Sequence, residues 1–563
     1  MAIDAVPADT AGATSWRRWA GLSIVLVASF MDLLDVNVVN VALPSLQQGL
    51  RATYATVQLV AGGYTLALGI GLITGGRLGD IYGHKRMFLV GTAAFVLASL
   101  TCACAQTPGM LIGGRLVQGA GAAIMIPQVL AFIHVRFSQE ELGRVVSIYA
   151  AITGVASVSG PILGGLLIGW NPFGLEWRTI FVMNVPVGCA AIALGLRYID
   201  ESRADRTARL DPVGMGLAAV ALTALLFPIV QGRQLSWPVW CLVAMGASVP
   251  LAVAFVSYER RRIRREGSAL VAVELFSRRS FSVGIIVQFL FQCAPAAFFL
   301  AWTIYLQFGL GWSAVHTGLT AIPFGLAVSL SGALSMRVTF PRYGRLSMAA
   351  GVVATATGML GYAWLVGRVA YPSSWEMIVP LTLIGTGLGQ VYAPLVNVTL
   401  REVPPQQSGS ASGLINAIAQ IGSSAGIAAI GILLFSAIGT QTASAARPEA
   451  PVVRTQLAAS GLSGTDLEHQ LAVFHRCTVV LADQPSQQAE SCERGTTPAV
   501  AAAIARTRAA GFEQAFQEVL WCITGLLAIA LLCIRALPHQ SPAGAASAPR
   551  ARRPGRSRIP ARK

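Results

Sequence analysis

Fourteen long apolar runs, each bounded by charged or turn-forming residues, constrain this chain more than any other feature of its sequence. Crossing the roughly 30 Å hydrocarbon core of a bilayer takes about 20 apolar residues in a helix, because each backbone polar group must be bonded within the segment. The sequence therefore predicts an all-α polytopic membrane protein. The expected spans are 20–43, 57–76, 87–106, 110–133, 147–169, 178–197, 212–231, 238–258, 281–306, 317–337, 346–366, 376–400, 413–436 and 513–535.

Composition supports a membrane protein and argues against two other classes. Hydrophobic residues make up 54% of the 563 residues and charged residues only 12%, and the mean hydropathy is +0.62. The net charge of +16 does not indicate a nucleic-acid partner, because no polar domain gathers the basic residues. The nine cysteines show no CxxC pairs and the six histidines are scattered, so we expect no metal site, no catalytic residues and no enzyme.

The distribution of basic residues predicts the orientation in the membrane. About 30 of the 41 lysines and arginines lie on alternate loops and about 10 on the opposite side. Under the positive-inside rule, both termini are then cytoplasmic and the protein lies in the cell membrane. The run ERRRIRREG at 259–267 is chiefly a topology signal, with contact to anionic lipid as the alternative.

Two segments lie outside the expected spans. The segment 437–512 is a long extracytoplasmic loop rich in Ala, Ser, Gln and Thr. Its oxidising compartment would allow a disulfide between Cys477 and Cys492, although both thiols could also remain free. The tail 536–563 is rich in Pro, Ala and Arg, and this composition predicts a disordered basic cytoplasmic segment.

Two aspartates lie in the middle of the first apolar run. Asp32 and Asp35 are three residues apart, so they share a helix face, which Asn37 and Asn40 widen. A carboxylate near the bilayer centre costs at least about 2.5 to 3.5 kcal/mol, so it must be paired, protonated or open to water. This polar face of the helix is therefore expected to point into the protein interior and not towards lipid.

Arg115, in LIGGRLVQGAGAAIMIPQ, is the single basic residue in the interior of an expected span, away from the span ends. With a rise of about 1.5 Å per residue, Asp35 and Arg115 reach similar depths in antiparallel helices and could meet. The arginine would favour the charged carboxylate, and separation in an apolar site would favour the protonated form. The carboxylate could thus carry a proton, or the pair could be a static contact that fixes helix packing.

The stretch GGRLGDIYGHKRM at 75–87 lies between the second and third expected spans. Its glycines allow a tight turn, its aspartate can cap a helix start, and its cations can pair with carboxylates. The spacing GxLxDxxGxxR closely resembles the signature loop of the major facilitator superfamily, where it acts as a conformational latch. The resemblance implies gating roles for Gly76, Arg77, Gly79, Asp80, Gly83, Lys85 and Arg86.

Four further stretches resemble motifs of the fourteen-span drug:proton antiporter subfamily. LDVNVVNVALP at 34–44 has Asp35 at the acidic position, and RLVQGAGAA at 115–123 has Arg115 at the arginine implicated in proton coupling. WRTIFVMNVPVG at 177–188 resembles the sixth-span motif. GVASVSGPILGG at 154–165 resembles the fifth-span antiporter motif, with Ala156 where the family usually has glycine. Its motif residues here are Gly154, Gly160, Pro161, Gly164 and Gly165.

A second copy of the loop at 75–87, which we call the latch loop, indicates an internal repeat. The stretch SGALSMRVTFPRYGRLSM at 331–348 resembles a degenerate copy of the latch loop that has no acid matching Asp80. The resemblance therefore implies the major facilitator fold, with two six-helix bundles and two additional helices. The expected domains are a cytoplasmic N-terminus at 1–19, a first bundle at 20–197, the additional helices at 198–280 and a second bundle at 281–535.

The resemblance implies a proton-coupled antiporter that exports small lipophilic molecules, such as drugs, dyes or antibiotics, by alternating access. The proton gradient supplies the energy, no cofactor is needed, and we expect a monomer. Asp35 is the expected principal protonation site, Asp32 its auxiliary and Arg115 its electrostatic partner. A dedicated exporter of one metabolite and a proton-coupled importer remain alternatives, whereas a receptor would need a soluble signalling domain that the sequence does not offer.

Fourteen polar and aromatic residues of the expected spans are candidates for a substrate cavity, although each can equally serve helix packing. The spans of the second bundle contain almost no acid, which favours monocationic, neutral or zwitterionic substrates. The candidates are Asn37, Asn40, Gln58, Tyr64, Gln118, Gln128, Gln288, Gln292, Trp302, Tyr305, Tyr392, Asn397, Asn416 and Gln420.

Overall fold

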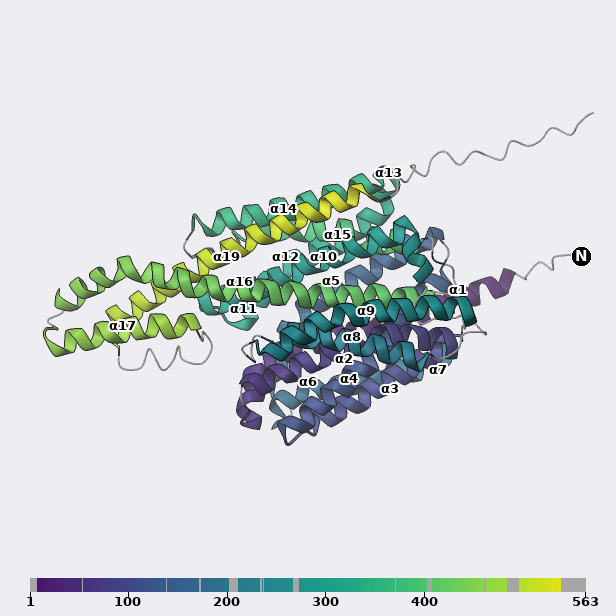
Figure 1. Cartoon of the computed structure of the whole chain (residues 1–563), viewed down its shortest axis with the longest axis horizontal. Helices are drawn as coiled ribbons and strands as arrows, with labels where there is room; N and C mark the ends of the chain where they lie inside the picture. The colour runs from purple at the N-terminus through teal and green to yellow at the C-terminus, as the bar shows by residue number, and fades with distance from the viewer. Residues whose placement is uncertain are drawn as a thin grey trace, which may run out of the picture.

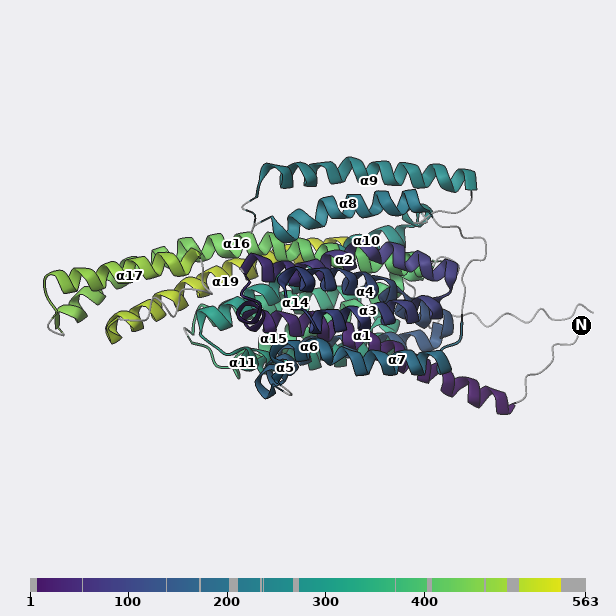
Figure 2. The same ribbon diagram turned by 90° about the horizontal axis from the view of Figure 1, so that it is seen from below.

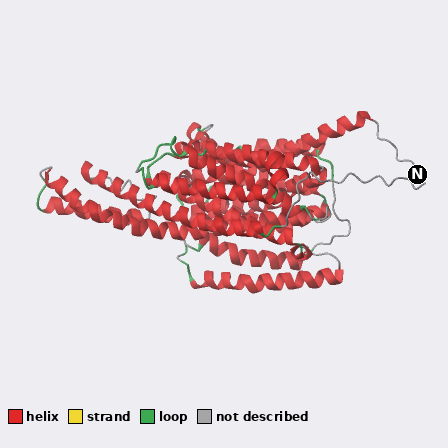
Figure 3. Cartoon of the chain, turned by 90° about the horizontal axis from the view of Figure 1, so that it is seen from above, coloured by secondary structure: helices red, strands yellow, loops and turns green. Residues whose placement is uncertain are grey.

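The structure is a computed structural model that describes most of residues 8–537. The positions within that range that it leaves undescribed are 53, 138, 172–173, 202–210, 233–234, 236, 267–272, 370, 402, 404–407, 460–461 and 484–495. All regular structure in the described residues is helical (Figures 1 and 3).

The helices follow one another as a series of long segments joined by short connections. The first half consists of α1 (Ala8–Leu50), α2 (Tyr54–Tyr82), α3 (His84–Ala103), α4 (Pro108–Arg136), α5 (Gln139–Trp170), η2 (Glu176–Arg178), α6 (Thr179–Val182), α7 (Asn184–Tyr198), α8 (Pro212–Gln231) and α9 (Val239–Glu266). The second half consists of η3 (Val273–Ser277), α10 (Arg279–Ile304), η4 (Tyr305–Gly309), α11 (Ala314–Thr320), α12 (Ile322–Leu334), η5 (Ser335–Thr339), α13 (Phe340–Tyr343), α14 (Arg345–Val366), α15 (Ile378–Leu400), α16 (Ser408–Ala459), α17 (Thr465–Asp483) and α19 (Pro498–Arg535).

Thirteen of the expected spans coincide with helices that are long and apolar enough to cross a membrane in the described part of the chain. The fifth expected span, 147–169, falls within α5, a helix of 32 residues. The prediction of an all-α polytopic membrane protein is therefore confirmed. The ninth and tenth spans are less regular than expected, because each contains a π-helical turn, at η4 and at η5.

One apolar core lies mainly in the first bundle and another in the second. Phe88, Phe95 and Phe132 lie in the first core, to which α10, α15 and α16 of the second bundle also contribute. Phe298 and Phe516 lie in the core of the second, which α10, α12, α14, α15, α16 and α19 form. The two bundles meet mainly where α2 packs against α16 and α5 packs against α12.

The two additional helices lie at one edge of the molecule, as Figure 2 shows. Helix α8 packs on α2 and α16, and α9 packs on α8. Only 11% of the α9 span is buried within the protein, against 78% of the α4 span. In a bilayer α9 would therefore face lipid along most of its length.

The segment 437–512, expected as a loop, is largely helical. Helix α16 has 52 residues, about 78 Å at the usual rise per residue, and thus extends well beyond a roughly 30 Å hydrocarbon core. It forms, with α17 and the start of α19, a projection with its own small core around Phe474, Val453 and Ile504 (Figure 1). The difference arises because hydropathy marks where a helix leaves lipid and not where it ends.

Candidate functional site

The first bundle encloses an ion pair between two transmembrane helices. Asp35 lies on α1 and Arg115 on α4, and each side chain is only 1% exposed. Nη1 of Arg115 donates to Oδ2 of Asp35. The two side chains that the sequence places at similar depth therefore meet inside the protein.

Three neutral side chains complete the surroundings of the Asp35 carboxylate. Oδ1 of Asp35 accepts from Nε2 of Gln118 at 2.9 Å and from Nδ2 of Asn184 at 2.7 Å. Both amide groups also donate to the hydroxyl of Ser99, at 2.8 and 3.0 Å. Four helices, α1, α3, α4 and α7, thus contribute to one hydrogen-bond network, which we call the Asp35 network.

The Arg115 guanidinium has further partners on α2 and connects the two aspartates. Its Nε donates to the carbonyl of Val60 at 3.3 Å, and its Cζ lies 4.2 Å from the centre of the Tyr64 ring. The hydroxyl of Tyr64 donates to Oδ1 of Asp32. Tyr64 therefore lies between the Asp32 carboxylate and the guanidinium that pairs with Asp35.

Small residues allow these helices to approach closely enough for the contacts. A Cβ atom on Gly119 of α4 would lie 2.3 Å from the carbonyl oxygen of Tyr64 on α2. On α5, a Cβ on Gly160 would lie 2.3 Å from Cβ of Asn37, and one on Gly164 would lie 3.2 Å from the side chain of Val38. The glycines of the fifth-span motif thus hold α5 against the turn of α1 that follows Asp35.

The other fifth-span motif residues are also on α5. Gly154 and Pro161 lie within that helix, and a Cβ on Gly165 would lie 3.0 Å from the side chain of Val315 on α11. Helix α5 therefore contacts the first bundle through one part of the motif and the second bundle through another.

The latch loop between α2 and α3 is centred on a fully buried carboxylate. Asp80 is 0% exposed, with Nη1 of Arg77 at 4.0 Å and Nε2 of His84 at 3.8 Å. Gly83 has a φ of 104°, which only glycine adopts readily, and it directly precedes α3. The turn therefore depends on the glycine that the signature spacing places there.

Glu201 ties the far side of the latch loop to the end of the sixth span. It accepts from the backbone N of Lys85 at 3.1 Å and lies 3.7 Å from Nε of Arg86. Nζ of Lys85 also donates to the carbonyl of Leu196 at 2.9 Å. Glu201 was not among the residues expected from the sequence, because an acid at the end of a span carries no distinguishing pattern.

Gln128 lies at the latch loop, although the sequence suggested it for the cavity. Its Nε2 donates to the carbonyl of Gly75 at 2.8 Å, and its Oε1 lies 2.8 Å from Nδ1 of His84. A Cβ on Gly79 would lie 2.0 Å from that Oε1, so the glycine leaves room for the amide. Gly76 lies between these contacts, in the last turns of α2.

The remaining cavity candidates lie in several different places. Asn37 bonds the carbonyl of Leu33 in its own helix, and Asn416 bonds that of Ser412. Other members belong to the second bundle or to its contact with α2, while the side chains of Asn40 and Gln58 lie outside the described ones. Besides Asn416, the second-bundle members are Gln288, Gln292, Trp302, Tyr305, Tyr392, Asn397 and Gln420.

Aromatic side chains surround the second-bundle candidates. Nε1 of Trp302 donates to the hydroxyl of Tyr362 at 2.8 Å, and Tyr305 stacks on Phe516 with ring centroids 4.9 Å apart. The hydroxyl of Tyr392 donates to Oε1 of Gln292. The side chain of Gln420 packs 3.3 Å from where a Cβ of Gly69 on α2 would lie, so it belongs to the contact between bundles.

Cys477 is buried in the core of the helical projection and is disulfide-bonded. Cys492, the partner that the sequence suggests, lies outside the described residues.

Two bundles of membrane-spanning helices with a buried ion pair and a glycine-bearing latch loop define the class: a polytopic membrane transporter. Residues 25–427 match the Major Facilitator Superfamily, and the chain belongs to that family. The family consists of transporters, so membership also disfavours the membrane-enzyme class.

Several relatives bear names that refer to antibiotics. The chain is 36% identical over 531 residues to the probable actinorhodin transporter of Streptomyces coelicolor, covering 93% of this chain and 92% of that protein. It is 31% identical to the tetracenomycin C resistance and export protein of Streptomyces glaucescens, covering 75% of this chain and 77% of the relative. It is also 31% identical to the multidrug resistance protein Stp of Mycobacterium tuberculosis, covering 72% and 74%.

A solved structure supports the fold alone. The human organic anion transporter MFSD10 (TETRAN) is similar to this chain with a TM-score of 0.55 at 13% identity, covering 92% of this chain and 99% of that one. The prediction of a major facilitator fold is therefore confirmed.

Proposed function

We propose that the protein is a proton-coupled antiporter that exports small lipophilic molecules of the antibiotic kind across the cytoplasmic membrane. The single observation that carries the proposal is the buried pair between Asp35 and Arg115. A charged pair in the interior of a membrane protein is expensive to form, and it is useful where a transport cycle makes and breaks it.

The Asp35 network suits reversible proton binding. When Asp35 is charged, Arg115, Gln118 and Asn184 all donate to its two oxygens. A proton on Asp35 removes the attraction to Arg115 and turns one oxygen into a donor, so the same three donors no longer fit. Protonation therefore favours a different arrangement of α1, α4 and α7, and in this way it is linked to the movement of the bundle.

Asp32 acts as the auxiliary group in this proposal. It is 5% exposed, bonds the hydroxyl of Tyr64, and is linked through the Tyr64 ring to Arg115. Movement of Arg115 towards or away from Tyr64 would therefore change the electrostatic interaction of the guanidinium with both carboxylates, Asp32 and Asp35.

The latch loop is proposed as the gate. Asp80 and Arg77 are buried together beneath the α2–α3 turn, whereas Lys85 and Arg86 are held by Glu201 and Leu196 at the end of α7. Rocking of one bundle against the other in alternating access requires these contacts to break and re-form. Gly76 and Gly79 allow the close helix packing, and Gly83 forms the turn, on which these contacts depend.

The basic residues support an orientation with both termini in the cytoplasm, in which α17 and the helical projection lie outside the cell. Outward transport is supported by the relatives, several of which are named for resistance or export. The chain is proposed to act as a monomer, because the two bundles of one chain share an apolar core and together complete the fold.

A dedicated exporter of one metabolite is the second candidate. The relative matched over 93% of this chain is named for one compound, actinorhodin, and not for multidrug resistance. Efflux of a panel of chemically dissimilar dyes and antibiotics separates the two candidates. A response confined to one compound favours the dedicated exporter.

The test of proton coupling uses the purified protein in proteoliposomes with an imposed pH gradient and ethidium as the probe. The native chain is expected to move ethidium against its gradient while protons move the other way. Asp35→Asn is expected to abolish this movement, because asparagine imitates only the neutral form. Asp466→Asn, at an exposed position on α17, is the matched control and is expected to transport normally. Undiminished coupling in Asp35→Asn would remove Asp35 from the mechanism.

A further inference from the structure

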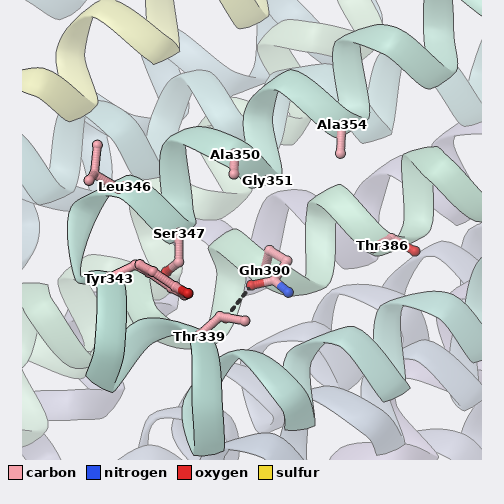
Figure 4. Close-up of a pocket in the computed structure, with 9 residues that line it drawn as sticks. All are labelled: Thr339, Tyr343, Leu346, Ser347, Ala350, Gly351, Ala354, Thr386 and Gln390. Carbon is pink, nitrogen blue, oxygen red and sulfur yellow. Dashed lines mark hydrogen bonds between the residues drawn. The ribbon is translucent and has the colours of Figure 1, made fainter.

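The second bundle contains a pocket of about 470 Å³ at 331–348, the degenerate copy of the latch loop (Figure 4). Leu346, Ala350 and Ala354 of α14 form an apolar wall, and Thr339 of η5 and Gln390 of α15 add polar groups. Oγ1 of Thr339 bonds Oε1 of Gln390 at 2.8 Å. Among the described residues Nε2 of Gln390 makes no hydrogen bond, which leaves a donor for an occupant.

The pocket opens on the outer surface of the bundle. Tyr343 and Leu346, which line it, are 54% and 65% exposed. Helix α14 is a membrane span, so an exposed apolar side chain on it faces lipid. An occupant would therefore enter sideways from the bilayer.

Around His84 and Gln128, the corresponding region of the first bundle leaves a cavity of only about 10 Å³. Gly83 and Gly344 both have positive φ and directly precede the next helix, which makes the two loops counterparts. In the first loop, the amide of Gln128 packs against Gly79 and reaches His84 at 2.8 Å. In the second loop, the π-helical turn η5 ends at Thr339 and the pocket remains open.

The two loops also differ in charge. Arg77 and Arg86 of the first loop lie 4.0 and 3.7 Å from carboxylates. In the second loop Arg337 and Arg342 are exposed, form no ion pair with a described carboxylate, and no Asp or Glu occurs in 331–366. The guanidinium of Arg342 lies 5.9 Å from the ring centre of Tyr343, at the rim of the pocket.

We propose that this pocket binds one anionic phospholipid. An acyl chain lies against the wall formed by Ala350 and Ala354, and the phosphate lies against Arg342. An apolar cleft open to lipid with an uncompensated cation at its rim matches an amphiphile that carries a negative head group. The lipid comes from the leaflet beside the 337–345 loop, which is the cytoplasmic leaflet in the orientation proposed above.

The test is native mass spectrometry of the purified full chain, titrated with phosphatidylglycerol or with phosphatidylcholine of the same acyl chains. The first phosphatidylglycerol is expected to bind about fivefold more tightly, the effect of one arginine near a lipid phosphate. Arg342→Gln is expected to remove this preference. Arg368→Gln is the matched control, because Arg368 lies over Trp364 just beyond the other end of α14, at 5.4 Å, away from the pocket.

A second pair of variants tests the pocket itself. Ala354→Phe fills it and is expected to remove the tight binding of one lipid, whereas Val353→Phe points at bulk lipid from a position 50% exposed and is expected to bind as the native chain does. Equal affinities for the two lipids in the native chain, or unchanged binding in Ala354→Phe, would overturn the proposal. So would displacement of the tight lipid by ethidium, which would make the pocket a substrate entrance. Binding is measured without transport, so this result is independent of proton coupling.

Discussion

At the scale of single residues, the molecule depends on how the Asp35 carboxylate is satisfied. Both of its oxygens are hydrogen-bonded, and its charge is balanced by one guanidinium that is itself 1% exposed. Removing one partner of such a pair typically costs about 3–5 kcal/mol, because the other charge is left buried and uncompensated. The structure is therefore sensitive to the charge at position 35 and not only to its shape.

This sensitivity predicts a stability defect when the guanidinium is removed. Arg115→Met should lower the free energy of unfolding by about 3–5 kcal/mol, because the Asp35 carboxylate would stay buried without its charged partner. Thermal melting of the purified protein in detergent measures the loss.

The control for this variant is a solvent-exposed ion pair. Arg454 lies 3.2 Å from Glu468 with both side chains more than 60% exposed, so Arg454→Met should change stability by about 1 kcal/mol or less. A loss in Arg115→Met as small as that in Arg454→Met would mean that the buried pair does not stabilise the fold.

The charged members of the site were predictable from the sequence, whereas two of its neutral members, Asn184 and Ser99, were not. Asp35 and Arg115 stand out because a charge inside an apolar run needs a partner. Asn184 and Ser99 bond the same network but look like any small polar residue in a helix, although Asn184 lies within the quoted sixth-span stretch. The sequence shows that Gln128 is a polar residue in a span, which makes it a cavity candidate. It does not show that the side chain contacts Gly75 and His84 at the latch loop.

At the scale of helices, the contact between α1 and α5 keeps Asp35 in place. Because a Cβ on Gly160 would lie 2.3 Å from Cβ of Asn37, a larger residue forces the two helices apart. Gly160→Val should therefore reduce ethidium transport in proteoliposomes at least about tenfold, a loss of about 1.4 kcal/mol in the transport barrier.

Gly169→Val is the matched control for this helix contact. A Cβ at position 169, on the same helix, would have no neighbour within 4 Å, so this variant should transport as the native chain does. Normal transport by Gly160→Val would show that the close contact is not required.

The additional helices are joined by a carboxylate with two roles. Asp211 is 1% exposed, accepts from the backbone N of Gly214 at 2.8 Å as the N-cap of α8, and lies 2.6 Å from Nη1 of Arg262 on α9. Tyr258 donates to the same oxygen at 3.1 Å. One side chain thus begins α8 and fastens α9 to it.

Two substitutions at this position separate the two roles. Asp211→Asn keeps the cap and removes the charge, whereas Asp211→Ala removes both, and loss of a cap costs about 1 kcal/mol. Hydrogen exchange at the Gly214 amide should rise about fivefold more in Asp211→Ala than in Asp211→Asn. Equal exchange in the two variants would contradict the capping role.

At the scale of the whole molecule, the chain is two bundles, a lipid-facing pair of helices and an extramembrane projection. The spans were predictable because lipid imposes length and hydropathy on each of them. The projection was not, because the residues of 437–459 and 498–512 stay helical for a different reason: they pack on α17 around Val453 and Phe474. A count of apolar residues does not detect such a contact.

The proposed orientation predicts which surfaces a membrane-impermeant maleimide reaches in intact cells. In a background without free native thiols, Asp466→Cys on α17 should be labelled from outside. Arg17→Cys, an exposed position in the first turns of α1, should be labelled only after permeabilisation. The reverse pattern would invert the topology and make the basic loops extracellular.

The most direct test of proton coupling compares two modes of transport by Asp35→Asn in the same proteoliposomes. Exchange of ethidium for ethidium needs no net proton movement, so it should continue when position 35 is permanently neutral. Accumulation driven by a pH gradient, followed together with the internal pH, should be lost. Proton-driven accumulation at the native rate in Asp35→Asn would contradict the account.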